Sequence, residues 1–243
     1  MLLPAGVAPE ARLLLIGRAL RAFTDGYVAI LLPAYLFALG LGKWEVGLIS
    51  TATLLGSALM TLAVGKWGHR LAQRSLLLAA GLLMVVTGLL LAGLSEFWPL
   101  LLVAFVGTMN PSSGDVSVFL PLEHARLAET AQGELRTFLF ARYTFIGAFC
   151  AAVGALATAI PQYLTNAGMP QINAIRLMFV VYGLVGVAIL FLYRRLPIPE
   201  LHQHAAQPTP LGPSRTIVLR LAALFSVDAF AGGLVVNTLL ALW

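Results

Sequence analysis

Two aspartates lie inside long apolar stretches of this sequence, where a charged side chain is costly to place. Asp25 stands near the middle of the run 13–39, and Asp228 holds the corresponding place in the run 216–243. A carboxylate in a cavity of low dielectric constant can exchange a proton near neutral pH, so both are candidate substrate- or proton-binding groups. Arg21, one helical turn before Asp25, could instead form a purely structural ion pair with it.

A third aspartate, Asp115, lies in another apolar run, five residues after Asn110. Pro111 removes a backbone hydrogen bond, and the side chain of Asn110 can satisfy a carbonyl group that this exposes. A helix broken in this way presents polar backbone to a cavity, which favours a binding site; the alternative is a static kink. Arg142, in the next apolar run, is expected at a similar depth, where it could pair with Asp115 as a structural ion pair or as a gate.

The other polar and small residues are weaker candidates for a functional site. Glu123, Glu129 and Glu134 fall between two apolar runs, and we expect them on a solvated connecting segment. Small residues at Gly147 and Gly154 have the spacing of closely packed helices rather than of a site. The chain has one cysteine and no phosphate-binding glycine loop, so we expect no cofactor, no metal site and no enzymatic activity.

The composition identifies the medium in which these side chains must lie. Of the 243 residues, 60% are hydrophobic and 10% are charged, and the mean hydropathy is +0.92. Soluble domains carry about 25% charged residues, so this chain could not cover a water-facing surface. The composition excludes a soluble enzyme and a disordered regulator, and it predicts an all-α, polytopic membrane protein.

Seven apolar runs are long enough to cross a bilayer core of about 30 Å as helices. They lie near 13–39, 46–65, 75–94, 98–122, 137–160, 175–193 and 216–243. If the N-terminus is cytoplasmic, twelve Lys and Arg residues fall on the inner side, and only Lys43 and Arg176 fall on the outer side. This asymmetry predicts a multi-pass protein of the cytoplasmic membrane with a cytoplasmic N-terminus. It also accounts for the net charge of +5 without a nucleic-acid partner.

An internal repeat relates the first and last of these runs. Residues 12–39 align without a gap with residues 215–242, at an offset of 203, and the alignment pairs Asp25 with Asp228. Both runs begin on the same side of the membrane, so the repeat is parallel. Two repeat units of this size need about 400 residues, so we expect the chain to be incomplete at its C-terminus. The expected organisation is a six-helix transmembrane bundle in 1–195, a cytoplasmic linker in 196–214 and the first helix of a second bundle in 215–243.

The loop between the second and third runs carries a motif. Residues 65–74 read Gly-Lys-Trp-Gly-His-Arg-Leu-Ala-Gln-Arg, which resembles the loop signature of the major facilitator superfamily. His69 stands where the family has an aspartate that helps to latch two bundles together at the cytoplasmic side. The resemblance therefore implies either a missing latch or a pH-dependent one. The matching positions are Gly65, Gly68, Arg70 and Arg74.

The resemblance implies a secondary transporter that moves a small solute by alternating access between two bundles. The embedded carboxylates and the lack of a nucleotide-binding motif predict proton coupling through Asp25, helped by Asp115 or Asp228. The implied partners are a small-molecule substrate, a proton or another coupling ion, the lipid bilayer and a C-terminal bundle. A non-transporting scaffold or accessory subunit, or an inactive fragment, is the alternative. The candidate substrate- or proton-binding residues are Asp25, Asp115, Arg142, Asp228, Asn110 and Arg21, and the candidate conformational motif is Gly65, Gly68, His69, Arg70 and Arg74.

Overall fold

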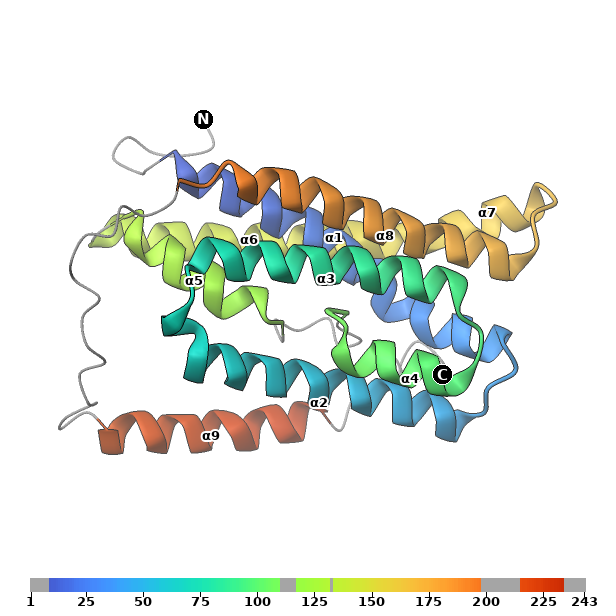
Figure 1. Ribbon diagram of the computed structural model, residues 1–243, viewed down its shortest axis with the longest axis horizontal. Coiled ribbons are helices and arrows are strands. Elements are labelled where there is room, and N and C mark those ends of the chain that lie inside the picture. The colour runs from blue at the N-terminus through green and yellow to red at the C-terminus, as the bar shows by residue number, and fades with distance from the viewer. Residues whose placement is uncertain (1–8, 110–116, 132, 198–214, 234–243) are drawn as a thin grey trace. The chain divides into compact units, whose positions relative to one another are not determined.

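The computed structural model describes residues 9–109, 117–131, 133–197 and 215–233, which form helices joined by short connections (Figure 1). No strand occurs in these ranges, in agreement with the predicted all-α membrane fold. The elements are α1 (Glu10–Ala38), α2 (Lys43–Trp67), the 3-10 turn η1 (Gly68–Arg70), α3 (Gln73–Gly93), α4 (Phe97–Val106), α5 (Phe119–Glu129), α6 (Glu134–Leu156), the 3-10 turn η2 (Ala157–Ala159), α7 (Ile160–Asn166), α8 (Gln171–Arg194) and α9 (Arg215–Gly233).

Five helical stretches of the described residues are long and apolar enough to cross a membrane. They correspond to the first, second, third, fifth and sixth predicted runs. The chain divides into two compact units, Met1–Pro197 and Ile198–Trp243, and α9 belongs to the second. The five stretches are Glu10–Ala38, Lys43–Trp67, Gln73–Gly93, Glu134–Asn166 and Gln171–Arg194.

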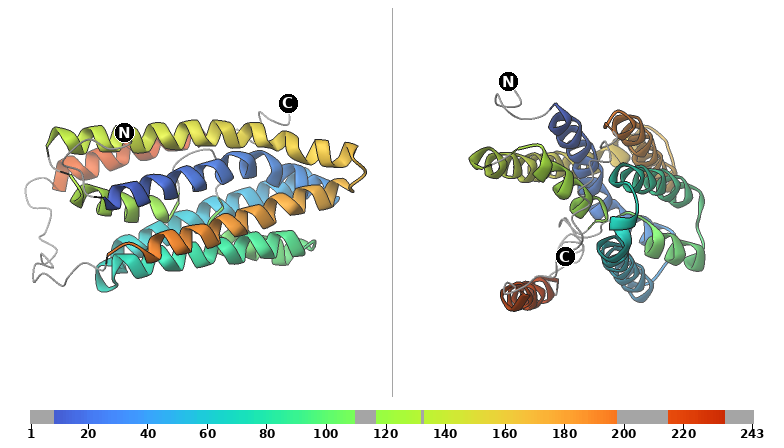
Figure 2. Two further views of the ribbon diagram at one scale, coloured as in Figure 1. Left: turned by 90° about the horizontal axis from the view of Figure 1, so that it is seen from above. Right: turned by 60° about the vertical axis from the view of Figure 1, so that its left-hand side comes forward.

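The first unit is built from three closely packed helix pairs: α1 with α6, α2 with α4, and α3 with α8 (Figure 2). Glycines allow the backbones to approach. A Cβ atom at Gly154 of α6 would overlap the carbonyl of Phe23 in α1, and one at Gly56 of α2 would overlap the carbonyl of Phe105 in α4. Small residues at helix crossings are the usual means of packing helices in lipid, because lipid tails are as apolar as the side chains. The predicted packing role of the small residues in α6 is therefore confirmed.

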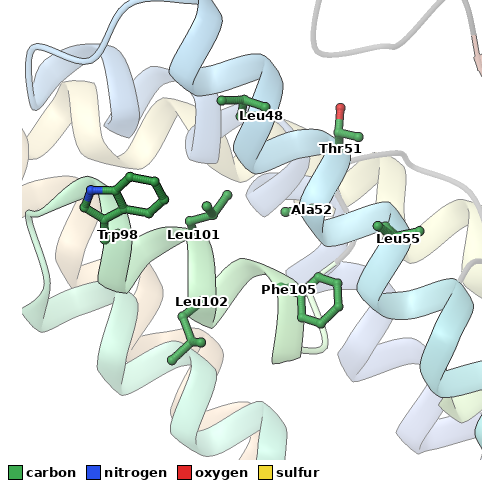
Figure 3. A pocket seen from close by; sticks show the side chains of 8 residues that line it. All are labelled: Leu48, Thr51, Ala52, Leu55, Trp98, Leu101, Leu102 and Phe105. Carbon is green, nitrogen blue, oxygen red and sulfur yellow. The ribbon is translucent and has the colours of Figure 1, made fainter.

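An apolar groove lies between α2 and α4 (Figure 3). Thr51 supplies the only hydroxyl group of its lining, so the groove can contact hydrocarbon but offers no charged group to a solute. The lining residues are Leu48, Thr51, Ala52 and Leu55 of α2 and Trp98, Leu101, Leu102 and Phe105 of α4.

The fourth predicted run does not form one helix. Helix α4 ends at Val106, and the described backbone is non-helical from Gly107 to Met109. Helix α5 begins only at Phe119, so the described residues before and after 110–116 belong to two separate helices, and the effect of Pro111 itself stays a prediction.

The connecting segment predicted around Glu123 is wrong only in part. Glu129 and Glu134 are exposed, as expected, but Phe119–Glu129 form helix α5, and Glu123 is buried on it. This helix is amphipathic, and tertiary packing of its apolar face stabilises it although it has only 11 residues. Its buried face consists of Phe119, Leu122, Glu123, Arg126 and Leu127.

The connection after α6 also differs from the sequence prediction. A loop was expected from Pro161 to Ala174, but the helical chain continues through η2 and α7 to Asn166. Pro161 lies in the first turn of α7, where its missing N–H group has no partner within the helix in any case. Gly168 then adopts a φ of 99°, which a residue without Cβ tolerates, and turns the chain into α8.

Basic residues gather at one end of the first unit, which we call the basic end. The starts of α1, α3 and α6 and the ends of α2, α5 and α8 lie there, at the left of Figure 1. The opposite end holds Lys43 and Arg176. The exposed residues of the basic end include Arg12, Lys66, Arg70, Arg136, Arg194 and Arg195.

Candidate functional site

Glu123 of α5 lies at the centre of a buried polar cluster. Its Oε2 atom accepts hydrogen bonds from the Arg21 guanidinium and the Tyr143 hydroxyl, and its Oε1 atom accepts one from the Tyr193 hydroxyl. The side chains of Glu123 and Arg21 are 0% and 2% exposed. Because the donors belong to α1, α6 and α8, one carboxylate connects four helices. We call these four residues the Glu123 cluster.

Arg21 links the Glu123 cluster to a second acidic residue. Its guanidinium lies 4.2 Å from the ring centroid of Phe119 and, with Asp25, lines a small polar cavity. Asp25 interacts electrostatically with Arg21 and with Tyr182 of α8. The Tyr182 hydroxyl is 3.0 Å from that of Thr108, at the end of the interrupted span. The cavity thus combines a carboxylate, a guanidinium and hydroxyl groups, and its lining also includes Met84 and Ser117.

Tyr143 is held in place on both sides of its ring. The guanidinium of Arg18, another buried residue of α1, lies 5.1 Å from the ring centroid and packs against Gly147. The ring of His124 meets Tyr143 edge to face, with centroids 4.9 Å apart. Two arginines of α1 therefore lie at this cluster: Arg18 contacts the ring of Tyr143, and Arg21 contacts the carboxylate of Glu123.

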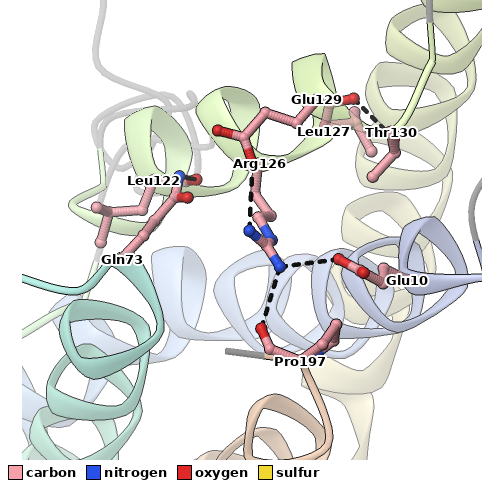
Figure 4. Close-up of polar contacts among 8 residues, drawn as sticks. All are labelled: Glu10, Gln73, Leu122, Arg126, Leu127, Glu129, Thr130 and Pro197. Carbon is pink, nitrogen blue, oxygen red and sulfur yellow. Dashed lines mark hydrogen bonds and ion pairs between the residues drawn. The ribbon is translucent and has the colours of Figure 1, made fainter. Parts of the chain in front are cut away.

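Arg126 fastens α5 one turn after Glu123, at the basic end (Figure 4). Its guanidinium contacts the carboxylate of Glu10 in α1 at 3.0 Å and that of Glu129 at 3.2 Å. It also donates to the carbonyl oxygen of Pro197, just after α8, at 3.1 Å. Polar contacts therefore anchor both the middle and the end of α5.

The structure corrects the ion pair that we considered for Arg21. Its ion-pair partner is Glu123, and Asp25 is a second acidic neighbour. Glu123 is also the residue that the sequence analysis missed. Its signal is the combination of Glu123 and Arg126 one turn apart with apolar residues at helical spacing, which indicates a buried amphipathic helix.

The structure describes fewer contacts for the remaining candidate residues. Arg142 is half-buried on α6, with its guanidinium 4.6 Å from the ring centroid of Phe138. Asp115, its expected partner, and Asn110 lie outside the described residues, so this pair stays a prediction. Asp228 is exposed on α9 within the second unit.

The loop motif lies at the basic end. Gly65 is in the last turn of α2, Gly68–Arg70 form η1, and Arg74 is in the first turn of α3. Arg74 donates to the carbonyl oxygen of Arg194 at 2.5 Å, which ties α3 to the end of α8. The side chain of His69 lies outside the described part of the chain, so the latch stays a prediction.

Comparison with known proteins identifies the family. The sequence profile of the Major Facilitator Superfamily matches residues 14–243. The chain is also 24% identical over 167 residues to the uncharacterized membrane protein YJR124C of Saccharomyces cerevisiae. That match covers 68% of this chain and 37% of the yeast protein, so the chain spans little more than a third of this relative's length. The profile match extends over nearly all of the sequence and agrees with the apolar helices, and the chain therefore belongs to the major facilitator superfamily, a family of multi-pass membrane transporters.

Proposed function

We propose that this protein is a secondary active transporter that moves a small solute across the cytoplasmic membrane by alternating access, coupled to protons. The observation that carries the proposal is the placement of the acidic Asp25 and the basic Arg21 around one small cavity, inside a bundle of helices long and apolar enough to cross a membrane. Charged residues within a membrane are rare and mark solute, ion or proton pathways. Membership of the family supports transport in general, and this pair of charges supports coupling.

The proposed organisation places the substrate between two bundles. Residues 1–195 form the first bundle, 196–214 a cytoplasmic linker, and 215–243 the first helix of the second bundle. The repeat that pairs Asp25 with Asp228 supports this arrangement, because it gives each bundle an acidic residue at the same position of its first helix. The excess of basic residues at one end supports a cytoplasmic location of that end.

In the proposed mechanism, Asp25 binds the proton and Arg21 responds to its charge. When Asp25 is ionised, Arg21 has two acidic neighbours, its ion-pair partner Glu123 and the more weakly interacting Asp25. When Asp25 is protonated, Arg21 keeps its ion pair with Glu123, so this buried guanidinium has an acidic partner at either stage. Protonation of Asp25 therefore costs little ion-pair energy. It can favour one orientation of the bundles over the other.

The other candidates complete the proposal. Asn110, Asp115 and Arg142 are further proposed substrate- or proton-binding residues, and Asp228 serves as the counterpart of Asp25 in the second bundle. The loop motif acts during the movement of the bundles, and it consists of Gly65, Gly68, His69, Arg70 and Arg74.

The test is transport by the protein reconstituted in liposomes that enclose a pH-sensitive dye. Candidate solutes are added under an imposed pH gradient, and solute uptake is measured together with proton flux. We expect Asp25→Asn to abolish the response of transport to the gradient but to retain exchange of solute without a gradient. Glu96→Gln, which removes an exposed acid at the end opposite the basic end, is the control and should leave the response unchanged.

Two results would contradict the proposal. Gradient-driven transport that survives Asp25→Asn removes Asp25 from the coupling step. Solute transport by the unsubstituted protein with no accompanying proton flux removes proton coupling altogether.

A further inference from the structure

Four arginines lie at the basic end of the α3–α8 pair. Arg70 closes η1, Arg74 lies in the first turn of α3, and Arg194 and Arg195 end α8. The 2.5 Å hydrogen bond from Arg74 to the carbonyl of Arg194 brings the two helix ends into contact. We call these four residues the arginine patch.

The arginine patch has no compensating carboxylate within the described parts of the chain. Nearby acids are engaged elsewhere, since Arg126 binds Glu10 and Glu129. The Nε atom of Arg74 is buried and has no hydrogen-bond partner among the described residues. The other three side chains are exposed. Four positive charges at one helix junction therefore favour an anion, and guanidinium groups bind phosphate oxygens through paired N–H donors.

The surface of α8 beside the patch is apolar. Leu177, Leu184 and Phe191 are 43%, 61% and 61% exposed. They recur every seven residues, which is close to two helical turns, so they lie on one face. Arg194 and Arg195 follow Phe191 by three and four residues, and they therefore continue this face at its basic end. By helical rise, the apolar part is about 20 Å long. One leaflet of hydrocarbon is about 15 Å deep, so this face is long enough to line an acyl chain across a leaflet.

The surface of α3 repeats this pattern. Leu82, Val86 and Leu89 are exposed at helical spacing. Leu71, between Arg70 and the start of α3, is 58% exposed beside the patch itself. Both helices of the pair therefore carry an exposed apolar face and an arginine-rich end.

We propose that the arginine patch and the adjoining apolar faces of α3 and α8 bind an anionic phospholipid. The phosphate contacts the arginines, and an acyl chain lies along the apolar faces. A free phosphate ion would use the arginines but leave the apolar faces uncovered. A partner helix would cover the apolar faces but leave four guanidinium groups without anions. A phospholipid satisfies both surfaces at once, and this inference does not depend on which solute the protein moves.

The experiment measures lipid retention by the purified 243-residue chain in a neutral detergent, using native mass spectrometry. The probes are phosphatidylglycerol and phosphatidylcholine with identical oleoyl chains, supplied in equal amounts. We expect preferential retention of phosphatidylglycerol. The double variant Arg194→Gln, Arg195→Gln should weaken that retention by about fivefold for each arginine removed. Raising the ionic strength should weaken it further.

The matched control is Arg136→Gln, which removes an exposed arginine at the basic end on α6 rather than on α3 or α8. It should leave the retention of phosphatidylglycerol unchanged, and unchanged melting temperatures identify variants that remain folded. A second variant, Leu184→Gln, places an amide on the apolar face. It should reduce retention of the oleoyl lipid but not of phosphatidylglycerol with six-carbon chains.

Three outcomes would overturn the proposal. Equal retention of the two lipids means that the patch does not select an anion. Equal weakening by Arg136→Gln and by the double variant means that the basic end attracts anionic lipid generally, without a site. Displacement of the lipid by equimolar inorganic phosphate or glycerol phosphate means that the patch binds free phosphate and the apolar faces contribute nothing.

Discussion

At Glu123, three hydrogen-bond donors converge on one carboxylate that has no contact with water. Asp25 lies one helical turn after Arg21, the ion-pair partner of Glu123, and it is only half-buried and lines a cavity. The two acids therefore have different surroundings. Glu123 has a full set of partners for its charged form, whereas Asp25 is only partly buried and lines the small cavity. This contrast supports Glu123 as a positioning residue and Asp25 as the exchanging group.

Replacing Glu123 by Gln should destabilise the protein by about 3 kcal/mol, because a buried guanidinium loses its ion-pair partner. The measurement is the free energy of unfolding in mixed micelles, compared with the unsubstituted protein. The control is Glu129→Gln on the same helix. Glu129 is 63% exposed in its pair with Arg126, and exposed pairs contribute at most about 1 kcal/mol.

A double variant separates charge from packing in this prediction. Arg21→Met combined with Glu123→Gln removes both charges, so it should be more stable than Glu123→Gln alone. Equal losses in Glu123→Gln and Glu129→Gln would mean that the Glu123 cluster does not stabilise the bundle through its ion pair.

The sequence identified Asp25 but not Glu123, and the reason is physical. Asp25 stands alone within an apolar run, so its cost in a membrane is evident from its neighbours. Glu123 lies near the edge of a run, and its partners are 20, 70 and 102 residues away along the chain. Only the packing of α1, α5, α6 and α8 brings these groups together.

At the scale of elements, the bilayer itself makes the long helices predictable. A span must satisfy its own backbone and fill about 30 Å with apolar side chains, so five apolar runs became five long helices. The short helices α5 and α7 were missed for the opposite reason. Helix α5 depends on tertiary packing, and α7 starts around Pro161. Neither is a long run of apolar residues, which is what a hydropathy pattern reveals.

The α1–α6 crossing gives a prediction for the helix pairs. Gly154→Ala should destabilise the protein by about 1–3 kcal/mol, because the new methyl group would overlap the backbone carbonyl of Phe23. Gly47→Ala is the control, since a Cβ atom at this helical position meets nothing within 4 Å. Alanine is also favoured over glycine within a helix, so this control should be neutral or slightly stabilising.

Melting curves of both variants in the same detergent provide the measurement. If Gly154→Ala is as stable as Gly47→Ala, α1 and α6 are not held at the close distance that the crossing requires. In that case the close contact of Arg18 in α1 with Gly147 in α6, which needs the same short distance between the helices, would not be held either.

At the scale of the molecule, the distribution of charge follows from the order of the spans. Between Lys43 and Arg136 the chain passes through α2, α3 and the interrupted span of α4 and α5. If each of these three segments crosses, the two residues lie on opposite sides of the membrane. The sequence predicts this alternation from its basic residues, but it cannot decide whether the interrupted span crosses completely. In the first unit, α4 starts at the end opposite the basic end and α5 finishes at the basic end, so we expect this segment to cross (Figure 1).

This arrangement can be tested in intact cells, because Cys150 is the only cysteine of the chain. In a Cys150→Ser background, a membrane-impermeant maleimide should label Lys43→Cys from outside the cell and label Arg136→Cys only after the membrane is opened. Both positions are exposed, so the reagent can reach each of them once it is on the correct side. The reverse pattern would place the basic end outside, against the charge asymmetry. Labelling of both from outside would mean that α4 and α5 enter and leave the membrane on one side, and the cavity beside Asp25 would then need a different path to the basic end.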